Sequence, residues 1–402
     1  MGNNARRLLE YTKEQLLSLL FRYANRTSSK DFTRQSKLGF ENTALIILKM
    51  VKKSIKAELM SFFYQVDKET EIPSRQAFSQ AREKISYRAF KDFFEKSCEV
   101  AVTGDAREYK GYRVFAVDGT SFGVGAQSKL SGYFGESTSI KGKAMCRISA
   151  VVDVINDSIV NAAVSPYSTG ERALAQGQIE ELKAVWNALF MFDRGYWSEE
   201  LIRRIMSNGQ KFLMRLASNA GRIAVRDGDG LRRHSFELPG GGTETLLTNI
   251  PEEEMSDDEL AALYTKRWGA ETKYLELKDR IQIDNLSGES ANIVLQDIYS
   301  ALYISNLVSF ICYESDETIK DRTMGKENKY EQKTNRTTCI SALRNRFIDI
   351  CLLDNPYKRN IALERLFRDV SRDVIYVNKS KPRPRNKRTI KNSRKHKPKN
   401  IL

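Results

Sequence analysis

The chain has 402 residues, of which 41% are hydrophobic and 10% aromatic, so it can form two or three domains around a large core. Its five cysteines are widely spaced with no Cys-x-x-Cys pair, and there are only two histidines, which argues against zinc sites and disulfides and fits a reducing cytoplasm. Any bound metal is therefore expected on carboxylates, which favours Mg²⁺ or Mn²⁺.

The sequence predicts no membrane partner. No apolar stretch follows MGNNARR, so no secretory signal is expected. The most apolar run begins at Ile298, is short, and contains three serines and an asparagine, which predicts a buried helix rather than a membrane span.

The net charge of +15 is concentrated near the C-terminus. Residues 379–402 contain eleven Lys and Arg residues and no acid, which leaves a net charge of +4 for the rest of the chain. A proline-studded basic tail cannot bury a core, so it is expected to be disordered. It is either a solvated end or a non-specific nucleic-acid arm. We favour the arm, because a run of like charges repels itself unless a polyanion is near.

Residues 1–105 are expected to form a helical DNA-binding domain. Four segments have helical spacing of apolar residues: 12–26, 41–65, 74–85 and 86–102. The third is short, and its polar positions suit contacts with phosphates and base edges; we predict DNA contacts for Arg75, Gln76 and Arg82. A plain helical bundle fits the same pattern equally well.

From Tyr112 the pattern changes to strands. The apolar run Val114 to Val117 reads as a buried strand that ends at Asp118, and a second run, Ala188 to Phe192, stops at Asp193. A β-hairpin is predicted between them, turning at residues 156–157, followed by a helix from about residue 171. A further helix and strand complete the order βββαβαβ.

This order is the one that a ribonuclease-H-like mixed sheet requires, with the fourth strand parallel to the first. Adjacent strands are about 4.8 Å apart, so Asp118 and Asp193 are expected to meet at one edge of the sheet. Two other acids have simpler explanations: Asp153 lies near the hairpin turn and Glu171 at a helix start, where turn and capping roles are more common than catalysis.

The predicted α/β catalytic domain covers residues 106–285. Asp-Gly and Gly-Gly turns between alternating segments predict a β-rich insertion at about 217–255. Helices follow in an α-helical C-terminal region, residues 286–378, before the basic tail of residues 379–402.

Residues 256–280 are predicted to form one helix capped by Ser256, with acids in its first turn. At roughly 100° per residue, the offsets of 3, 7 and 14 place four side chains within about 60° of one another. They are Tyr264, Arg267, Glu271 and Lys278. This stripe is either an ordinary salt-bridged surface, which stabilises a protein little, or a site that handles phosphates.

If this helix packs against the sheet edge, Asp118, Asp193 and Glu271 converge. Three acids cannot all be ionised within a few Å of one another without a cation. Two Mg²⁺ or Mn²⁺ ions about 3.5 to 4 Å apart would supply that charge and clamp both oxygens of an in-line displacement at phosphorus. Arg267 and Lys278 would then hold the phosphodiester.

Three motifs also carry a family resemblance. VDGTSF surrounds Asp118, FDRGYW surrounds Asp193, and Y-x2-R-x3-E-x6-K begins at Tyr264. Together they resemble the DDE transposases of bacterial insertion sequences, specifically the YREK group. PSRQAFSQAREKIS and LLTNIPEEEMSDDELAALYTKRWGAE are similar to that group as well, so the likeness covers most of residues 70–280.

The resemblance implies cut-and-paste transposition. In such enzymes one strand is nicked at each element end, and the freed 3′-OH attacks the opposite strand to form a hairpin. Water reopens the hairpin, and the 3′-OH attacks target DNA. The implied partners are double-stranded DNA, as terminal inverted repeats and target, and a second copy of the chain in a homodimer. The implied location is the bacterial cytoplasm, at the nucleoid.

The same resemblance assigns residue roles. The three acids would be the catalytic metal ligands, Tyr264, Arg267 and Lys278 would grip the element end, and the β insertion would help to hold the hairpin. A hairpin also calls for a displaced base on an aromatic platform. Trp197 and Trp268 are the candidates, although a core role is more common for a residue such as Trp268.

Two other functions are compatible with the sequence. One is a structure-selective nuclease on the same fold, which would hydrolyse DNA without joining it. The other is a decayed or domesticated transposase that binds specific DNA sequences without catalysis. Intact acids at all three positions argue against the second, because clustered negative charge hinders a protein that only binds DNA.

Overall fold

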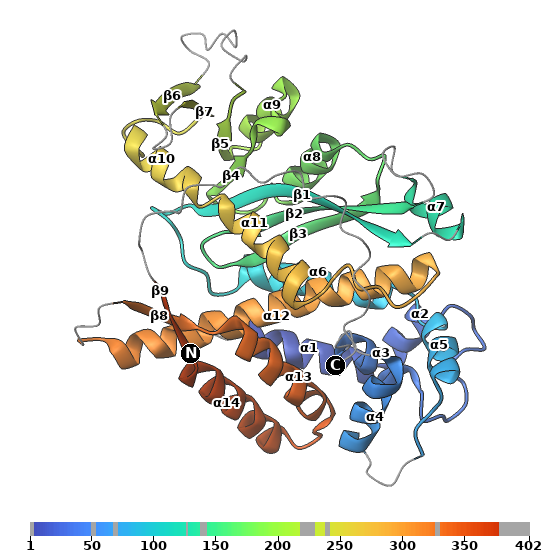
Figure 1. Cartoon of the computed structure of the whole chain (residues 1–402). Coiled ribbons are helices and arrows are strands. Elements are labelled where there is room, and N and C mark those ends of the chain that lie inside the picture. The colour runs from blue at the N-terminus through green and yellow to red at the C-terminus, as the bar shows by residue number, and fades with distance from the viewer. Residues whose placement is uncertain are drawn as a thin grey trace. The chain divides into compact units, whose positions relative to one another are not determined.

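The structure, a computed structural model, describes residues 4–49, 54–66, 71–125, 128–136, 143–217, 230–237, 242–325 and 330–377. The chain divides into two units (Figure 1): unit 1 contains Met1–Val100 and Arg280–Leu402, and unit 2 contains Ala101–Asp279. The predicted basic tail, residues 379–402, lies outside the described residues. So do residues 218–229 and 238–241 of the predicted insertion.

Unit 2 is built on a seven-stranded mixed sheet with the order β3-β2-β1-β4-β5-β7-β6. Along the chain the first five strands and their helices follow the predicted order βββαβαβ, with an added short helix α7 (Ser128–Phe134). The strands are β1 (Arg113–Gly125), β2 (Ala144–Asp153), β3 (Ser158–Pro166), β4 (Ala188–Phe192), β5 (Lys211–Arg215), β6 (Arg232–Glu237) and β7 (Thr243–Thr248).

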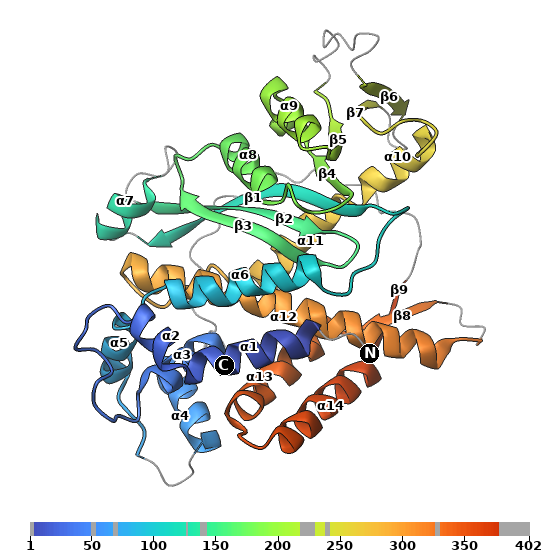
Figure 2. The same ribbon diagram turned by 180° about the vertical axis from the view of Figure 1, so that it is seen from behind.

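Helices cover both faces of this sheet. α8 (Glu171–Glu181) and α9 (Glu199–Ser207) lie on one face, and α11 (Trp268–Leu275) crosses the other, as Figures 1 and 2 show. Every residue of β4 is therefore buried, which explains its uninterrupted apolar sequence. Burying these apolar side chains stabilises the sheet by roughly 1.5–3 kcal/mol for each large one.

Asp153 has the predicted turn role. Its Oδ1 accepts hydrogen bonds from the N–H groups of Ile155 and Asn156 at the tip of the β2–β3 hairpin. Its Oδ2 pairs with Arg113 Nη2 at 2.9 Å in the buried interior. This acid is thus fully used by the fold.

One strand prediction differs from the structure, and the predicted insertion joins the main sheet. β1 continues past Asp118 to Gly125, because β2 pairs with it antiparallel along that whole stretch, so the acid lies in mid-strand. The described part of the insertion is a hairpin whose strand β7 pairs with β5, so it extends the main sheet. Apolar runs predict where β4 ends, but pairing with a neighbour decides where β1 ends.

Unit 1 is helical, and it joins the helices that precede residue 100 to those that follow residue 280. A two-stranded sheet of β8 (Glu331–Thr334) and β9 (Val374–Val377) completes it. Its helices are α1 (Asn4–Leu17), α2 (Leu19–Asn25), α3 (Phe40–Lys49), α4 (Ile55–Val66), α5 (Arg75–Glu83), most of α6 (Arg88–Thr103), α12 (Ala291–Thr323), α13 (Arg336–Leu352) and α14 (Pro356–Arg372).

The long helix α12 is the centre of unit 1 and contacts α1, α3, α5, α13 and α14. By length and composition it could cross a membrane, but 94% of its most apolar window is buried inside the protein. This confirms the prediction of a buried helix after Ile298.

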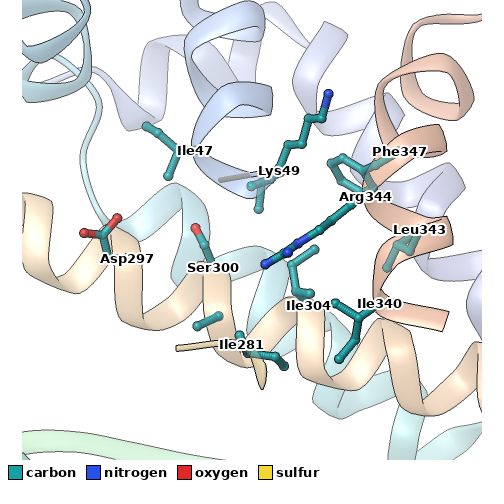
Figure 3. Close-up of a pocket in the computed structure, with 12 residues that line it drawn as sticks. Ile47, Lys49, Ile281, Asp297, Ser300, Ile304, Ile340, Leu343, Arg344 and Phe347 are labelled. Carbon is teal, nitrogen blue, oxygen red and sulfur yellow. The ribbon is translucent and has the colours of Figure 1, made fainter. Parts of the chain in front are cut away.

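A small cavity of about 30 Å³ lies between α3, α12 and α13 (Figure 3). Its lining is mostly apolar, and Lys49, Asp297, Ser300 and Arg344 are its polar members. Burial lowers the pKa of both cations. A volume of this size holds about one water molecule, so it is a packing feature rather than a ligand site.

Candidate active site

Asp118 and Asp193 lie at the same edge of the sheet, as predicted. Strands β1 and β4 are parallel, and their last paired residues are Val117 and Phe192. Each acid is the next residue along its own strand direction. Although 75 positions separate Asp118 and Asp193 in the sequence, they lie on neighbouring strands, which are about 4.8 Å apart.

The Asp118 carboxyl is partly buried, and burial raises its pKa to about 6. The backbone N–H of Gly119 donates to its Oδ1 at 2.9 Å and opposes this rise, as does the charge of Arg267. The charges of Glu271 and Glu171 act in the same direction as burial. The charges that act on the Asp118 carboxyl thus come from two acids, Glu271 and Glu171, and one arginine, Arg267.

Replacing Asp118 with asparagine should stabilise unit 2 at neutral pH. Between the ordinary pKa of 3.8 and about 6 the folded state binds a proton that the unfolded state releases, so stability falls as pH rises through this window. Relative to wild type, the variant should gain about 3 kcal/mol at about pH 7.5 and nothing below about pH 4. Urea unfolding at the two pH values measures the difference, and an equal gain at both would contradict the burial of charge as its cause.

Asp193 has a buried oxygen that lacks a hydrogen bond among the described residues. In the described part of the chain its Oδ1 has no hydrogen-bond partner, and Arg215 Nη1 is 3.9 Å away. An unsatisfied buried oxygen costs free energy, so its presence calls for a specific explanation. A cation that binds during function is one such explanation.

The predicted helix of residues 256–280 is present in three pieces. Ser256 and Glu259 form a capping box at the start of α10 (Asp257–Thr265), as the sequence indicates. Four N–H groups between Lys266 and Ala270 then bond three residues back instead of four, which tightens the backbone where α10 ends and α11 begins. A π-helical turn, Glu276–Arg280, follows α11.

The four side chains of the predicted stripe remain together despite this break. The Tyr264 hydroxyl donates to the carbonyl of Phe192 at 3.2 Å, directly before Asp193. Arg267 Nη2 is 3.1 Å from Glu271 Oε1, and Lys278 Nζ is 2.5 Å from Thr120 Oγ1, two residues after Asp118. The stripe is therefore attached to the end of β4 and to the middle of β1.

Tyr274 fixes α11 against the same place. Its hydroxyl donates to the carbonyl of Asp118 at 2.7 Å, and the side chain is buried. One helix and two strands thus bring Asp118, Asp193 and Glu271 to a common edge. The sequence spacing predicts the stripe, while Tyr274 could not be identified from it.

The donor set fits a hard divalent cation, because the described edge offers carboxylate oxygens, among them an Asp193 Oδ1 that accepts no hydrogen bond from the described residues. In the described part of the chain, no three His, Cys, Asp or Glu side chains are close enough together to hold a metal ion as they stand. Glu271 is instead paired with Arg267. Like charges separate unless a cation lies between them, so Glu271 would have to exchange Arg267 for the metal.

The predicted aromatic contacts lie beside this arginine. Trp268 is 42% exposed, and the Arg267 guanidinium lies 5.5 Å from the centre of its ring and 5.7 Å from that of Tyr264. Trp197 is half-buried, and its indole N–H has no partner among the described residues. Trp268 is thus a partly exposed residue whose ring carries a cation–π contact with Arg267.

The three predicted DNA contacts of α5 differ in accessibility. Arg75 and Gln76 are exposed. Arg82 is 2% exposed and bonds Gln296, Ser287 and Asp297, so it holds α5 to the start of α12. A side chain enclosed in this way does not reach a DNA phosphate, and its role is structural.

Sequence reasoning missed Glu171 as a neighbour of the site. It begins α8, and its charge acts on both Asp118 and Tyr196. The signal was weak, because an acid in the first turn of a helix is common for other reasons.

Comparisons with known proteins agree with this geometry. Residues 109–307 match the family model described as "Transposase DDE domain". The chain is 25% identical over 144 residues to "Putative transposase InsZ" of Escherichia coli strain K12. That alignment covers 34% of this chain and 47% of the relative, so it spans about half of the relative's length.

A solved structure is similar over most of the chain. It is described as a cryo-EM structure of the piggyBac transposase synaptic complex with hairpin DNA, and it matches with a TM-score of 0.52 and 11% identity. The match covers 89% of this chain and 84% of the other, and it confirms the ribonuclease-H-like fold. The stretch that matches the family model, residues 109–307, includes Asp118, Asp193 and Glu271.

Proposed function

We propose that the chain is a DNA transposase of the YREK group that moves an insertion sequence by a cut-and-paste route. Its reaction would be metal-dependent phosphoryl transfer: nicking at the element end, hairpin formation, hairpin opening and strand transfer. It would act in the bacterial cytoplasm on nucleoid DNA. A homodimer would pair the two terminal inverted repeats.

One observation carries the proposal: the parallel register of β1 and β4 places Asp118 and Asp193 side by side, and Glu271 is held near them by the contacts of α10 and α11. Three carboxylates with that arrangement suit two Mg²⁺ or Mn²⁺ ions, which would activate the attacking oxygen and stabilise the leaving one. A protein that only binds DNA gains nothing from these acids.

The protein's own side chains would position the DNA. Arg267 and Lys278 are cations within reach of the acids, so each can hold a phosphate oxygen of the element end. To do so Arg267 would release Glu271, which frees that carboxylate for its catalytic role. The partly exposed side chain of Trp268, beside Arg267, is the proposed platform for a displaced base.

The hairpin step has two supports. The YREK spacing is kept intact from Tyr264 to Lys278, and the similar piggyBac structure was solved with hairpin DNA. The β6–β7 hairpin extends the sheet beyond β5, on the side away from β1. We propose that it helps to hold the bent DNA.

The test uses the full chain, Mg²⁺ and a labelled DNA duplex that carries the end of the element flanking the gene. A transposase should yield a nicked strand, then a hairpin, then strand-transfer product with added target DNA. Chelating the metal should abolish all three products while DNA binding persists. A nuclease would give nicks without hairpin or joined product, and a pure binding protein would give none.

A further inference from the structure

The Glu171 side chain lies against the backbone of β1, beside the residue that follows Asp118. A Cβ atom built on Gly119 would be 3.0 Å from Glu171 Cδ and 3.1 Å from its Oε1. Real Cβ atoms are rarely found so close to other atoms, so a larger residue would push the carboxylate away. Gly119 therefore gives Glu171 access to the edge that carries Asp118.

Side chains alternate between the two faces of a strand, so Glu171 reaches Gly119 from the face opposite to that of Asp118 and Thr120. Thr120 bonds Lys278, next to the α11 face, whereas Glu171 begins α8 on the other. The last residue of β4, Phe192, pairs with Val117 of β1. From Asp118 onward this side of β1 therefore has no β4 residue beside it, and the edge is open there. An ion at this edge can thus be reached from both faces.

Helix capping does not account for Glu171. In the part of the chain that the structure describes, the start of α8 has no side-chain capping hydrogen bond, and the polar contact recorded for the Glu171 carboxylate is an ion pair. Its nearest cation is Arg147, whose Nε is 3.9 Å from Oε1. Arg147 Nη1 bonds the Thr169 carbonyl at 2.5 Å, so its charge is shared with another group.

Tyr196 supplies an independent observation. Its side chain is 3% exposed, and its hydroxyl has no hydrogen-bond partner among the described residues. The charges that act on it most strongly are those of Asp118 and Glu171, and that of Asp193 also contributes. Buried hydroxyl groups are almost always bonded, so this one indicates a ligand or a rearranged carboxylate near Tyr196 when the site is occupied.

We propose that Glu171 is a fourth carboxylate of the site and binds a divalent cation together with Asp118. The proposal rests on the proposed function, because it adds a ligand to the same metal site. A fourth acid suits a site for two hard cations, since each prefers six oxygen ligands and the three predicted acids must be shared between them. Tyr196 is a positioning residue, and its hydroxyl would donate to a carboxylate that holds the ion.

The experiment measures Mn²⁺ binding to the full chain by electron paramagnetic resonance, with Mn²⁺ alone as the probe. It also measures the Mg²⁺ concentration that gives half-maximal nicking of the labelled element end. Glu171→Gln removes the charge, and Gly119→Ala displaces the carboxylate without changing any charge. Glu180→Gln is the matched control, because Glu180 lies on the same helix with its charge paired to Lys183 at the surface.

Both Glu171→Gln and Gly119→Ala should weaken Mn²⁺ binding by at least about tenfold and raise the Mg²⁺ requirement by a similar factor. Glu180→Gln should match wild type in both measurements. If Glu171→Gln leaves the Mg²⁺ requirement of an active enzyme unchanged, the proposal is overturned and the proposed function stands. If wild type itself neither nicks the element end nor binds Mn²⁺, the proposed function fails and the fourth ligand fails with it.

Discussion

Replacing Glu271 with glutamine is expected to lower the rate of nicking at the element end by about 10³-fold or more. A metal-bound transition state is stabilised by several kcal/mol, and each 1.36 kcal/mol corresponds to a factor of ten. The amide keeps the size of the side chain and its hydrogen bond with Arg267, so the fold and DNA affinity should persist. Single-turnover nicking and a gel-shift titration on the same preparation measure the two effects.

Asp279→Asn is the matched control for that variant, because Asp279 is an exposed acid eight residues further along the same helical stretch. It should nick DNA at the wild-type rate. Nicking by Glu271→Gln at the rate of this control would refute the role assigned to Glu271. A loss of DNA binding would instead show that the side chain acts in positioning.

Removing the charge of Asp297 is expected to destabilise unit 1 by about 3–5 kcal/mol, the largest effect on stability anticipated for this protein. Asp297 Oδ1 is 2.9 Å from Arg82 Nη2, and both side chains are almost fully buried. In Asp297→Asn the Arg82 guanidinium would remain buried without its counter-charge. Urea unfolding followed by helical circular dichroism measures the loss.

Glu99→Gln provides the comparison, because Glu99 pairs with Lys96 at the surface and such pairs contribute less than about 1 kcal/mol. The double variant Arg82→Met with Asp297→Leu should recover most of the stability, since it leaves no isolated charge. An equal loss in the double and the single variant would mean that shape rather than charge is what Asp297 contributes.

The sequence predicts those parts of the fold and site that depend on local pattern. The runs Val114 to Val117 and Ala188 to Phe192 are apolar because both faces of their strands are covered, and each run ends where an acid meets the sheet edge. Their pairing followed from the order of elements alone. The helical stripe from Tyr264 to Lys278 also followed from spacing, although the helix is broken near Arg267.

Other features depend on neighbours that lie far away in the sequence. Arg82 is of a residue type that often contacts DNA, but it bonds Ser287 and Asp297, which are more than 200 residues away along the chain. From the sequence, Glu171 is an ordinary acid in the first turn of a helix. The structure shows that its carboxylate lies against Gly119, which has no side chain to displace it. No periodicity encodes such contacts, because each is created when two separately folded segments come together.

The discontinuity of unit 1 has a consequence for biosynthesis. A ribosome delivers all of unit 2 before it delivers α12, whereas α1, α3 and α5 need α12 to cover their apolar sides. Domains tend to fold as units while the chain emerges, so the acidic edge is expected to form first and the helical unit last. A translation product that ends before α12 would then keep the carboxylates of unit 2 in place. It would expose the apolar sides of α1, α3 and α5 to chaperones and proteases.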